Sequence, residues 1–304
     1  MELTVVILNW NAATDTIHCV QNLSLWQRLQ PTIIVVDNAS TDGSGVAIAR
    51  ECPQVHLIFN ETNQGFAGGN NRGIEAALAK SDAPILLLNN DALLAENDAI
   101  RLVETLQADE KIGFIGPLLF DAEQRDRLLS AGSKDPARHH HSHNHQLLDH
   151  SGPVQVVECI PGTAIIGQAE VFRTVGLLDE DYFFASEVAD LCMLACQYGY
   201  LSVIDKRARA FHSLKRSSKF RETLYPYYII RNRFLLIRKF HRHWKVFYYG
   251  FWALYSLALT VKIRLTGKLP MAHSVWLGLV DGLWGRFGNQ NERVLAAVAG
   301  SNGG

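Results

Sequence analysis

Acidic residues are nearly absent from one part of this 304-residue sequence. Residues 206–270 contain 16 Lys/Arg and a single acid, Glu222, whereas residues 1–205 contain 11 Lys/Arg and 27 Asp/Glu. The formal net charge of −1 therefore conceals an acidic body and a basic segment, and it excludes a protein that is basic throughout. A basic segment of this kind is suited to meeting phosphate, lipid headgroups or both.

Cysteine is also scarce, with five residues whose number is odd and whose positions are scattered. Cys192 and Cys196 lie four residues apart, which is not the spacing of a zinc knuckle, so we expect buried free thiols in a reducing compartment. The sequence starts without a basic and apolar leader, which predicts a cytoplasmic location, including the inner face of the cytoplasmic membrane.

Short apolar runs alternate with helix-like stretches in the first part of the chain. Because each run is continuously apolar rather than alternating, the pattern predicts an α/β fold with a mostly parallel sheet that helices cover on both faces. The expected strands are 4–8, 32–36, 55–60 and 85–88, and the expected helices are 13–29, 46–52 and 72–80.

Polar clusters follow these runs, and ligands bind outside the carboxyl ends of the strands in such sheets. Asp91 ends Asn-Asn-Asp, so it is either a ligand for a hard divalent cation or a helix cap. Asp37 is either a turn residue or a hydrogen-bond partner of a nucleotide base or ribose. Residues 63–69 predict a glycine-rich loop that lets a ligand approach the backbone, although this is neither a dinucleotide fingerprint nor a P-loop.

Two further stretches stand out. Residues 139–150 hold six histidines, which predicts a solvated mobile loop or a metal-binding tract. Residues 246–261 carry no charge but are fewer than the roughly 20 needed to span a bilayer. Their aromatic side chains and basic flanks favour an interfacial helix, with a helix packed on the body or a second subunit, or a true span, as alternatives.

Seven motifs occur in a fixed order: VVILNWN, VVDNASTDGS, NQGFAGGNNRGI, LLLNNDALL, GLLDEDYFF, DLC with YGY, and YYIIRNRFLLIRKF. Together they resemble a bacterial family 2 glycosyltransferase of the rhamnosyltransferase-like branch, over about residues 3–240. The resemblance implies a GT-A-type domain over 1–222, with a nucleotide-sugar half at about 1–120 and an acceptor half at about 121–222. The basic, aromatic-rich segment 223–304 would be a helical extension that is membrane-interfacial or oligomerising.

The resemblance also implies a nucleotide-diphosphate-sugar donor, inversion at the anomeric carbon and a divalent cation, Mg²⁺ or Mn²⁺. Asp91 matches the final Asp of the family's metal motif, and Asn89 and Asn90 replace the first acid of its D-x-D. His212 matches a late histidine that completes the metal or phosphate shell, although a histidine at a strand end is otherwise structural. The residues implied in binding the nucleotide sugar are Asn9, Asn11, Asp37, Asn70, Arg72, Asn90 and Arg216.

Four basic residues allow two interpretations. Arg216, Lys219, Arg231 and Arg233 either clamp the donor diphosphate or belong to a solvated or lipid-facing basic surface.

The sequence departs from the family at the position of the general base. The family reads Glu-Asp-x-Asp-Leu-Cys, and alignment on Asp190-Leu191-Cys192 puts Val188 where the base is expected. Valine cannot accept a proton, so Glu187 takes over as base, another residue does so, or the enzyme is inactive or altered. Asp190 is the second candidate catalytic carboxylate, and it is otherwise a residue of the helix start.

The leading hypothesis is therefore a metal-dependent inverting glycosyltransferase that moves a sugar, with rhamnose as the family-level choice, onto a glycan or lipid-linked acceptor in cell-surface polysaccharide synthesis. A catalytically silent subunit that binds glycan or nucleotide sugar is the alternative that Val188 supports. A nucleotidyltransferase lacks support because the sequence has no basic triphosphate loop near its start. The expected partners are the donor, the acceptor, a membrane surface and a second copy of the chain, and not nucleic acid.

Overall fold

The computed structural model describes residues 1–140, 152–213 and 223–300. The chain divides into two compact units. Among the described residues, the sheet unit contains 1–135, 152–178 and 188–213, and the helical unit contains 136–140, 179–187 and 223–300.

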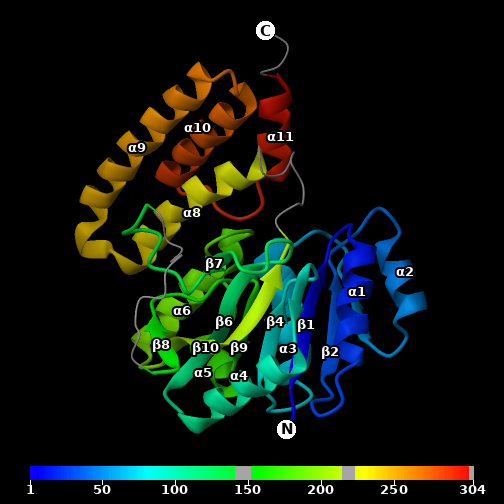
Figure 1. The fold of residues 1–304 in the computed structure, drawn as a ribbon. Helices are drawn as coiled ribbons and strands as arrows, with labels where there is room; N and C mark the ends of the chain where they lie inside the picture. Colours follow the sequence, from blue (N-terminus) through cyan, green and yellow to red (C-terminus); the bar gives the residue numbers. More distant parts are fainter. Residues whose placement is uncertain (141–151, 214–222, 301–304) are drawn as a thin grey trace. The chain divides into compact units, whose positions relative to one another are not determined.

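The sheet unit is built on one ten-stranded sheet (Figure 1). Its main path runs β3-β2-β1-β4-β9-β6-β10-β5, while β7 pairs with β6 and β8 with β10. The strands are β1 (Thr4–Asn9), β2 (Thr32–Asp37), β3 (His56–Phe59), β4 (Ile85–Leu88), β5 (Ala92–Leu94), β6 (Ile112–Asp121), β7 (Leu128–Ser130), β8 (Val154–Val157), β9 (Ala164–Gly167) and β10 (Leu201–His212).

The first four strands of the chain are parallel, as the sequence predicts, and β1 pairs with both β2 and β4. The rest of the sheet is mixed, because β9 pairs antiparallel with β4 and β6, and β5, β7 and β8 are also antiparallel to their neighbours. The α/β, doubly covered sheet is thus confirmed, and its second half also contains one parallel pair, β6 with β10.

Helices cover both faces of this sheet. One apolar cluster joins α1, α2 and α4 to one face, and a second joins α3, α5 and α6 to the other. The helices are α1 (Ala13–Ser24), α2 (Ser44–Glu51), α3 (Gly65–Leu78), α4 (Glu96–Ala108), α5 (Ala169–Val175) and α6 (Glu187–Gln197).

The glycine-rich stretch at 63–69 is not a loop as expected, because α3 already begins at Gly65. A Cβ atom on Gly69 would lie 2.4 Å from Leu8 Cδ1, and one on Gly73 would lie 2.3 Å from Val6 Cγ1. These glycines therefore allow α3 to pack closely on β1, which a helix with larger side chains at these positions could not do.

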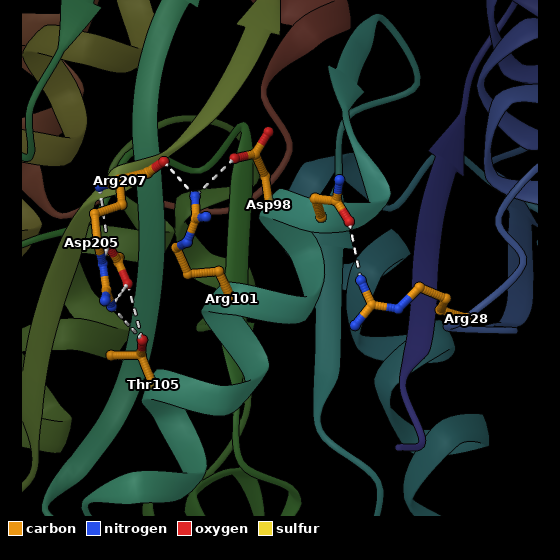
Figure 2. A network of polar contacts seen from close by, with 7 residues as sticks. Arg28, Asp98, Arg101, Thr105, Asp205 and Arg207 are labelled. Atoms are coloured by element: carbon orange, nitrogen blue, oxygen red, sulfur yellow. Dashed lines mark hydrogen bonds and ion pairs between the residues drawn. The ribbon is translucent and has the colours of Figure 1, made fainter.

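Strand β10 changes register halfway along its length, and this change sets where its end lies. Asp205 pairs with Pro117 of β6, but the next pair is Arg209 with Leu118, so residues 206–208 form a bulge. The buried Asp205 accepts hydrogen bonds from Arg207 (2.6 and 2.9 Å) and Thr105 (2.9 Å), as Figure 2 shows. This network fixes the bulge, after which β10 runs antiparallel beside β5 and ends at His212.

The helical unit has its own core, in which Tyr227 and Tyr228 are fully buried beside Phe183 and Leu277. One helical stretch, 242–265, is long and apolar enough to cross a membrane by length and composition alone, with a mean hydropathy of 1.3 in its best window. The elements of this unit are η1 (Glu180–Tyr182), α8 (Leu224–Phe240), η2 (Arg242–Trp244), α9 (Lys245–Leu265), α10 (Leu269–Trp284) and α11 (Asn291–Gly300).

Candidate functional site

A hydrogen-bonded chain of polar side chains crosses the carboxyl ends of the parallel strands. Asn90, after β4, donates to the Thr16 hydroxyl (2.9 Å), and Thr16 donates to the Asn9 side-chain carbonyl (2.7 Å). The Asn9 amide in turn donates to the Asp37 carboxylate at the end of β2 (2.6 Å). The sheet thus brings together three residues that the sequence predicts at the nucleotide site, Asn9, Asp37 and Asn90.

The sequence analysis did not predict two members of this hydrogen-bonded network, Thr16 and Ser40. Thr16 is fully buried on α1 and connects Asn90 to Asn9. Ser40 donates its hydroxyl to Asp37 (2.6 Å) and accepts a hydrogen bond from the backbone N–H of Asn11 (2.9 Å). In the sequence, Ser40 is recognisable only as a hydroxyl residue in the polar turn that follows Asp37. Thr16 is recognisable only as a threonine that interrupts the apolar pattern of a helix.

Asn11 takes part through both its backbone and its side chain. Its side-chain oxygen accepts from the N–H of Thr41 (2.8 Å), and its φ of +50° is a left-handed conformation that asparagine tolerates. The turns after β1 and β2 therefore fix one another. They leave the carboxylate of Asp37 held by neutral donors from Asn9 and Ser40.

Asp91 and His212 lie side by side at the same edge. Asp91 precedes β5, and the pairing of His212 with Ala92 places the imidazole Nε2 at 3.2 Å from the Asp91 carboxylate. Both side chains are partly open to solvent, with 15% and 18% exposed. Residues more than 120 positions apart in the sequence thus form a pair of oxygen and nitrogen donors.

The donor set fits a divalent cation that a nucleotide sugar also helps to bind. Carboxylate oxygen suits Mg²⁺ and Mn²⁺, and an imidazole is a common ligand for the softer of the two. Across residues 1–140, 152–213 and 223–300, no group of three His, Cys, Asp or Glu side chains is placed to hold a metal unaided. A cation at Asp91 and His212 would therefore need phosphate oxygens, as Mg²⁺ commonly does.

Cys19 is a buried thiol that interacts electrostatically with Asp91. Burial, and secondly the negative charge of Asp91, raise the pKa of the Cys19 thiol to about 12. All five cysteines are free, as expected, although Cys196 is exposed rather than buried.

Several predicted residues lie elsewhere. Asn70 is buried in α3 and donates to the carbonyl of Phe66 (2.8 Å) in its own helix. Arg72 is exposed on the same helix and pairs with Glu75 (3.3 Å). Arg216 and Lys219, and residues 141–150 of the histidine-rich stretch, lie outside the described residues.

The candidate base residues lie at the start of α6. Glu187 is its first residue, and both Glu187 and Asp190 are buried. Val188 belongs to the apolar cluster of α3, α5 and α6, and a Cβ on Gly162 would lie 3.0 Å from its Cγ2. Val188 is therefore a packing residue. Glu187 is the carboxylate next to it in the sequence.

A strained segment leads into Glu187. Phe183, Ala185 and Ser186 all have positive φ values, between 59° and 74°, which non-glycine residues rarely adopt. Asn232 of α8 donates to the carbonyls of Tyr182 (3.1 Å), Phe184 (2.7 Å) and Ala185 (2.6 Å). Sequence reasoning missed Asn232, whose signal was an amide between two arginines in an apolar helix.

Arg231 and Arg233 are buried, so a solvated or lipid-facing position is wrong for both. Arg231 donates to the carbonyls of Asp181 (2.9 Å), Tyr182 (2.8 Å) and Gly288 (2.5 Å), and also to Asn232 (2.8 Å). Arg233 donates to the carbonyl of Pro136 (2.8 Å), and its guanidinium lies 3.7 Å from the ring centre of Trp252. Both charges serve to hold backbone segments of the helical unit.

Known proteins share this sequence pattern. Residues 4–175 match the family model described as glycosyl transferase family 2. A dTDP-rhamnosyl transferase, RfbF, of Shigella flexneri is 25% identical over 217 residues, which is 69% of this chain and 71% of that protein. An N-acetylglucosaminyl-diphospho-decaprenol L-rhamnosyltransferase of Mycobacterium tuberculosis is 24% identical over 241 residues, covering 71% and 77%.

Solved structures share the fold. The mannosyltransferase PcManGT from Pyrobaculum calidifontis, in complex with GDP-Man and Mn²⁺, has a TM-score of 0.60 at 15% identity, covering 93% of this chain and 87% of its own. GalNAc-T7 with UDP, GalNAc and Mn²⁺ has a TM-score of 0.61 at 16% identity, covering 82% and 50%. Because the family model covers more than half of the chain, the chain belongs to glycosyltransferase family 2, with a GT-A-like sheet and with rhamnosyltransferases among its relatives.

Proposed function

We propose that this protein transfers a sugar from a nucleotide-diphosphate donor with inversion, and that it depends on a divalent cation. The observation that carries the proposal is the Asp91–His212 pair, which lies at the same strand-end edge as the Asn9–Asp37 network. A nucleotide held by the network would extend its diphosphate along an edge that already presents a carboxylate and an imidazole.

The chain's own residues divide the work between binding and proton transfer. The Asp37 carboxylate, fixed by Asn9 and Ser40, accepts hydrogen bonds from the base or ribose. The acceptor hydroxyl oxygen attacks the anomeric carbon as the bond to the diphosphate breaks, and the electron pair leaves with the nucleoside diphosphate. Glu187 takes the hydroxyl proton, which is the one base that a single displacement needs. Asp91 and His212 would hold Mg²⁺ or Mn²⁺, which would supply positive charge for the departing diphosphate.

The relatives support a proposal for the donor and acceptor classes. The Shigella flexneri relative is a dTDP-rhamnosyl transferase, and the Mycobacterium tuberculosis relative acts on a diphospho-decaprenol carrier. We therefore propose that rhamnose is transferred onto a glycan or lipid-linked acceptor for cell-surface polysaccharide, on the cytoplasmic side of the membrane.

The deciding experiment is calorimetric titration of UDP, TDP and GDP with and without Mn²⁺. We expect one nucleotide to bind tightly only with Mn²⁺, and the Asp91→Asn variant to lose that dependence. The matched control is Asp82→Asn, because Asp82 is an exposed acid of the sheet unit that pairs with Arg173 (2.6 Å). Equal binding by the Asp91→Asn variant would remove Asp91 from the cation site.

One observation favours a second candidate function. Val188 occupies the family's base position and is packed in the apolar core, as it would be in a catalytically silent subunit that binds nucleotide sugar. Such a subunit would pass the titration but would not convert dTDP-rhamnose to dTDP with any acceptor. Release of dTDP by the wild-type protein would exclude it.

A further inference from the structure

One face of α9 is apolar and exposed along the whole helix. Its exposed large side chains follow one another at intervals of three or four residues, so they share a face. Phe247, Leu254 and Leu265 are 62%, 70% and 84% exposed. The members of this stripe are Phe247, Phe251, Leu254, Leu257, Val261 and Leu265.

The opposite side of α9 is occupied by the helical unit itself. Trp252 and Ser256 are the buried residues of the helix, and Trp252 donates its indole N–H to the carbonyl of Ala137 (2.7 Å). The helix packs on α10 and α8, so it lies along the surface of the unit. The stripe thus points away from this packed side, and apolar side chains gathered in this way mark an interaction site.

The charges around the stripe are of one sign. Residues 223–300 contain 11 Lys/Arg but only two acids, Asp281 and Glu292. Asp281 is fully buried and accepts hydrogen bonds from Tyr227 and Arg293. The exposed basic residues that flank the stripe are Arg242, Lys262, Arg264 and Lys268.

We propose that α9 lies in the plane of an anionic lipid surface, with the stripe in the acyl region and the flanking basic residues at the phosphates. An apolar stripe explains insertion to a shallow depth, and basic residues near an anionic leaflet add electrostatic attraction to its phosphates. The lipid-linked acceptor of the proposed function would be reached from this surface, so the inference rests on that function for its purpose but not for its test.

The geometry favours this orientation over the other occupants. The helical stretch 242–265 is long enough to cross a membrane, but its uncharged part, 246–261, is only about 24 Å long, against a hydrocarbon core of about 30 Å, so a span would draw charged residues at its ends into the hydrocarbon. Crossing the membrane would also carry basic residues of one end through it. A second copy of the chain, packed on the stripe, would bring the two sets of flanking basic residues together, and like charges across an interface oppose association.

The test is co-sedimentation of the full chain with vesicles of phosphatidylcholine alone, or of equal parts phosphatidylcholine and phosphatidylglycerol. We expect binding to the anionic vesicles that weakens at least tenfold on neutral vesicles and falls steeply with salt. The Phe251→Glu/Leu254→Glu variant should bind anionic vesicles at least tenfold more weakly. The matched control is Leu25→Glu/Val46→Glu, because both residues are exposed and apolar but lie in the sheet unit.

Each other outcome overturns the proposal. Equal binding to both vesicle types would show that the basic residues flanking the stripe play no part. No binding to either type would show that α9 does not lie on a lipid surface. A dimer by light scattering that the α9 variant abolishes would make a second copy the occupant. Extraction of wild-type protein from membranes only by detergent, and not by high salt or alkali, would make α9 a span. Nucleotide titration of the same proteins separates this from the proposed function, since the α9 variant should bind nucleotide as the wild type does.

Discussion

The two units handle a fully buried charge in different ways. In the sheet unit, Asp205 is paired with the guanidinium of Arg207 and the hydroxyl of Thr105 (Figure 2). In the helical unit, Arg231 donates to three backbone carbonyls and to the side-chain oxygen of Asn232. Its guanidinium also lies 4.7 Å from the ring centre of Tyr228.

The difference shows what each charge is for. The Asp205 ion pair fixes the bulge that sets where β10 ends, and hence where His212 lies. Arg231, with Asn232, fixes the strained segment before Glu187. The Asp205 ion pair contains a carboxylate that titrates in the acid range. The Arg231 and Asn232 interactions depend on groups that keep their charge state.

The largest effect tests whether the segment held by Arg231 serves catalysis. We expect Glu187→Gln to lower kcat for sugar transfer by about 10²–10⁴-fold, because the amide cannot take the acceptor proton. The measurement is release of nucleoside diphosphate at saturating donor, with donor affinity followed by calorimetry.

Glu180→Gln is the matched control, since Glu180 is an exposed acid of the same segment. It should leave kcat within about twofold. Transfer by the Glu187→Gln variant at the wild-type rate would show that the helical unit holds this segment for stability alone.

The next effect concerns Asn232. We expect Asn232→Ala to lower the free energy of unfolding by about 2–3 kcal/mol, because buried carbonyls of Tyr182, Phe184 and Ala185 lose their donor. Urea unfolding at several pH values should show a loss that does not vary with pH, since no member of this group titrates. If Asn232 positions Glu187, kcat should also fall while the KM for donor is kept.

Asn97→Ala serves as the control for removal of an amide, because Asn97 lies on α4 and bonds to the exposed Arg28 (3.3 Å). A change below about 0.5 kcal/mol is expected there. An equally small loss for Asn232→Ala would contradict the role given to the three hydrogen bonds.

The smallest effect is the pH dependence of the Asp205 network. Burial raises the pKa of Asp205, but the hydrogen bonds from Arg207 and Thr105 and the Arg207 charge outweigh it, so the pKa lies below its ordinary value. A lowered pKa means that this stabilisation is present above the unfolded-state pKa of about 3.9 and is lost as the pH falls through the folded-state value.

We therefore expect Asp205→Asn to be about 1 kcal/mol less stable than wild type near pH 7, with the gap closing in strong acid. Urea unfolding of both proteins from about pH 7 to about pH 3 measures this. A gap that stays constant over that range would show that packing, and not the charge, accounts for the loss.

The parts of the fold that the sequence predicts are those with local signals. The continuous apolar runs give β1, β2, β3 and β4 to within two residues at each end. The expected helix to residue 29 ends instead at Ser24, because the chain must turn back into β2 at Thr32. Glycine is a local turn signal, so the sequence predicts a loop at residues 63–69. The close packing of α3 against Leu8 and Val6, which requires small residues, is a non-local contact that the sequence pattern does not reveal.

The candidate site divides in the same way. Asn9, Asp37 and Asn90 could be grouped because parallel neighbouring strands end at one edge. The contact of His212 with Asp91 depends on a bulge stabilised by Thr105, which is 100 residues from Asp205. Arg231 and Arg233 look like surface charges in sequence, because nothing near them along the chain supplies the carbonyls that satisfy them.

Sequence patterns alone predict the alternation of strands and helices, the polar residues at the strand ends, the family, and a valine at position 188 where the family's base is expected. These follow from side-chain pattern and from short motifs, which need no knowledge of distant partners. The tertiary structure was needed to show that His212 reaches Asp91, that the buried Arg231 holds the segment before Glu187, and that α9 leaves an apolar face open. Each of these depends on contacts between residues far apart in the chain, whose geometry is set by packing.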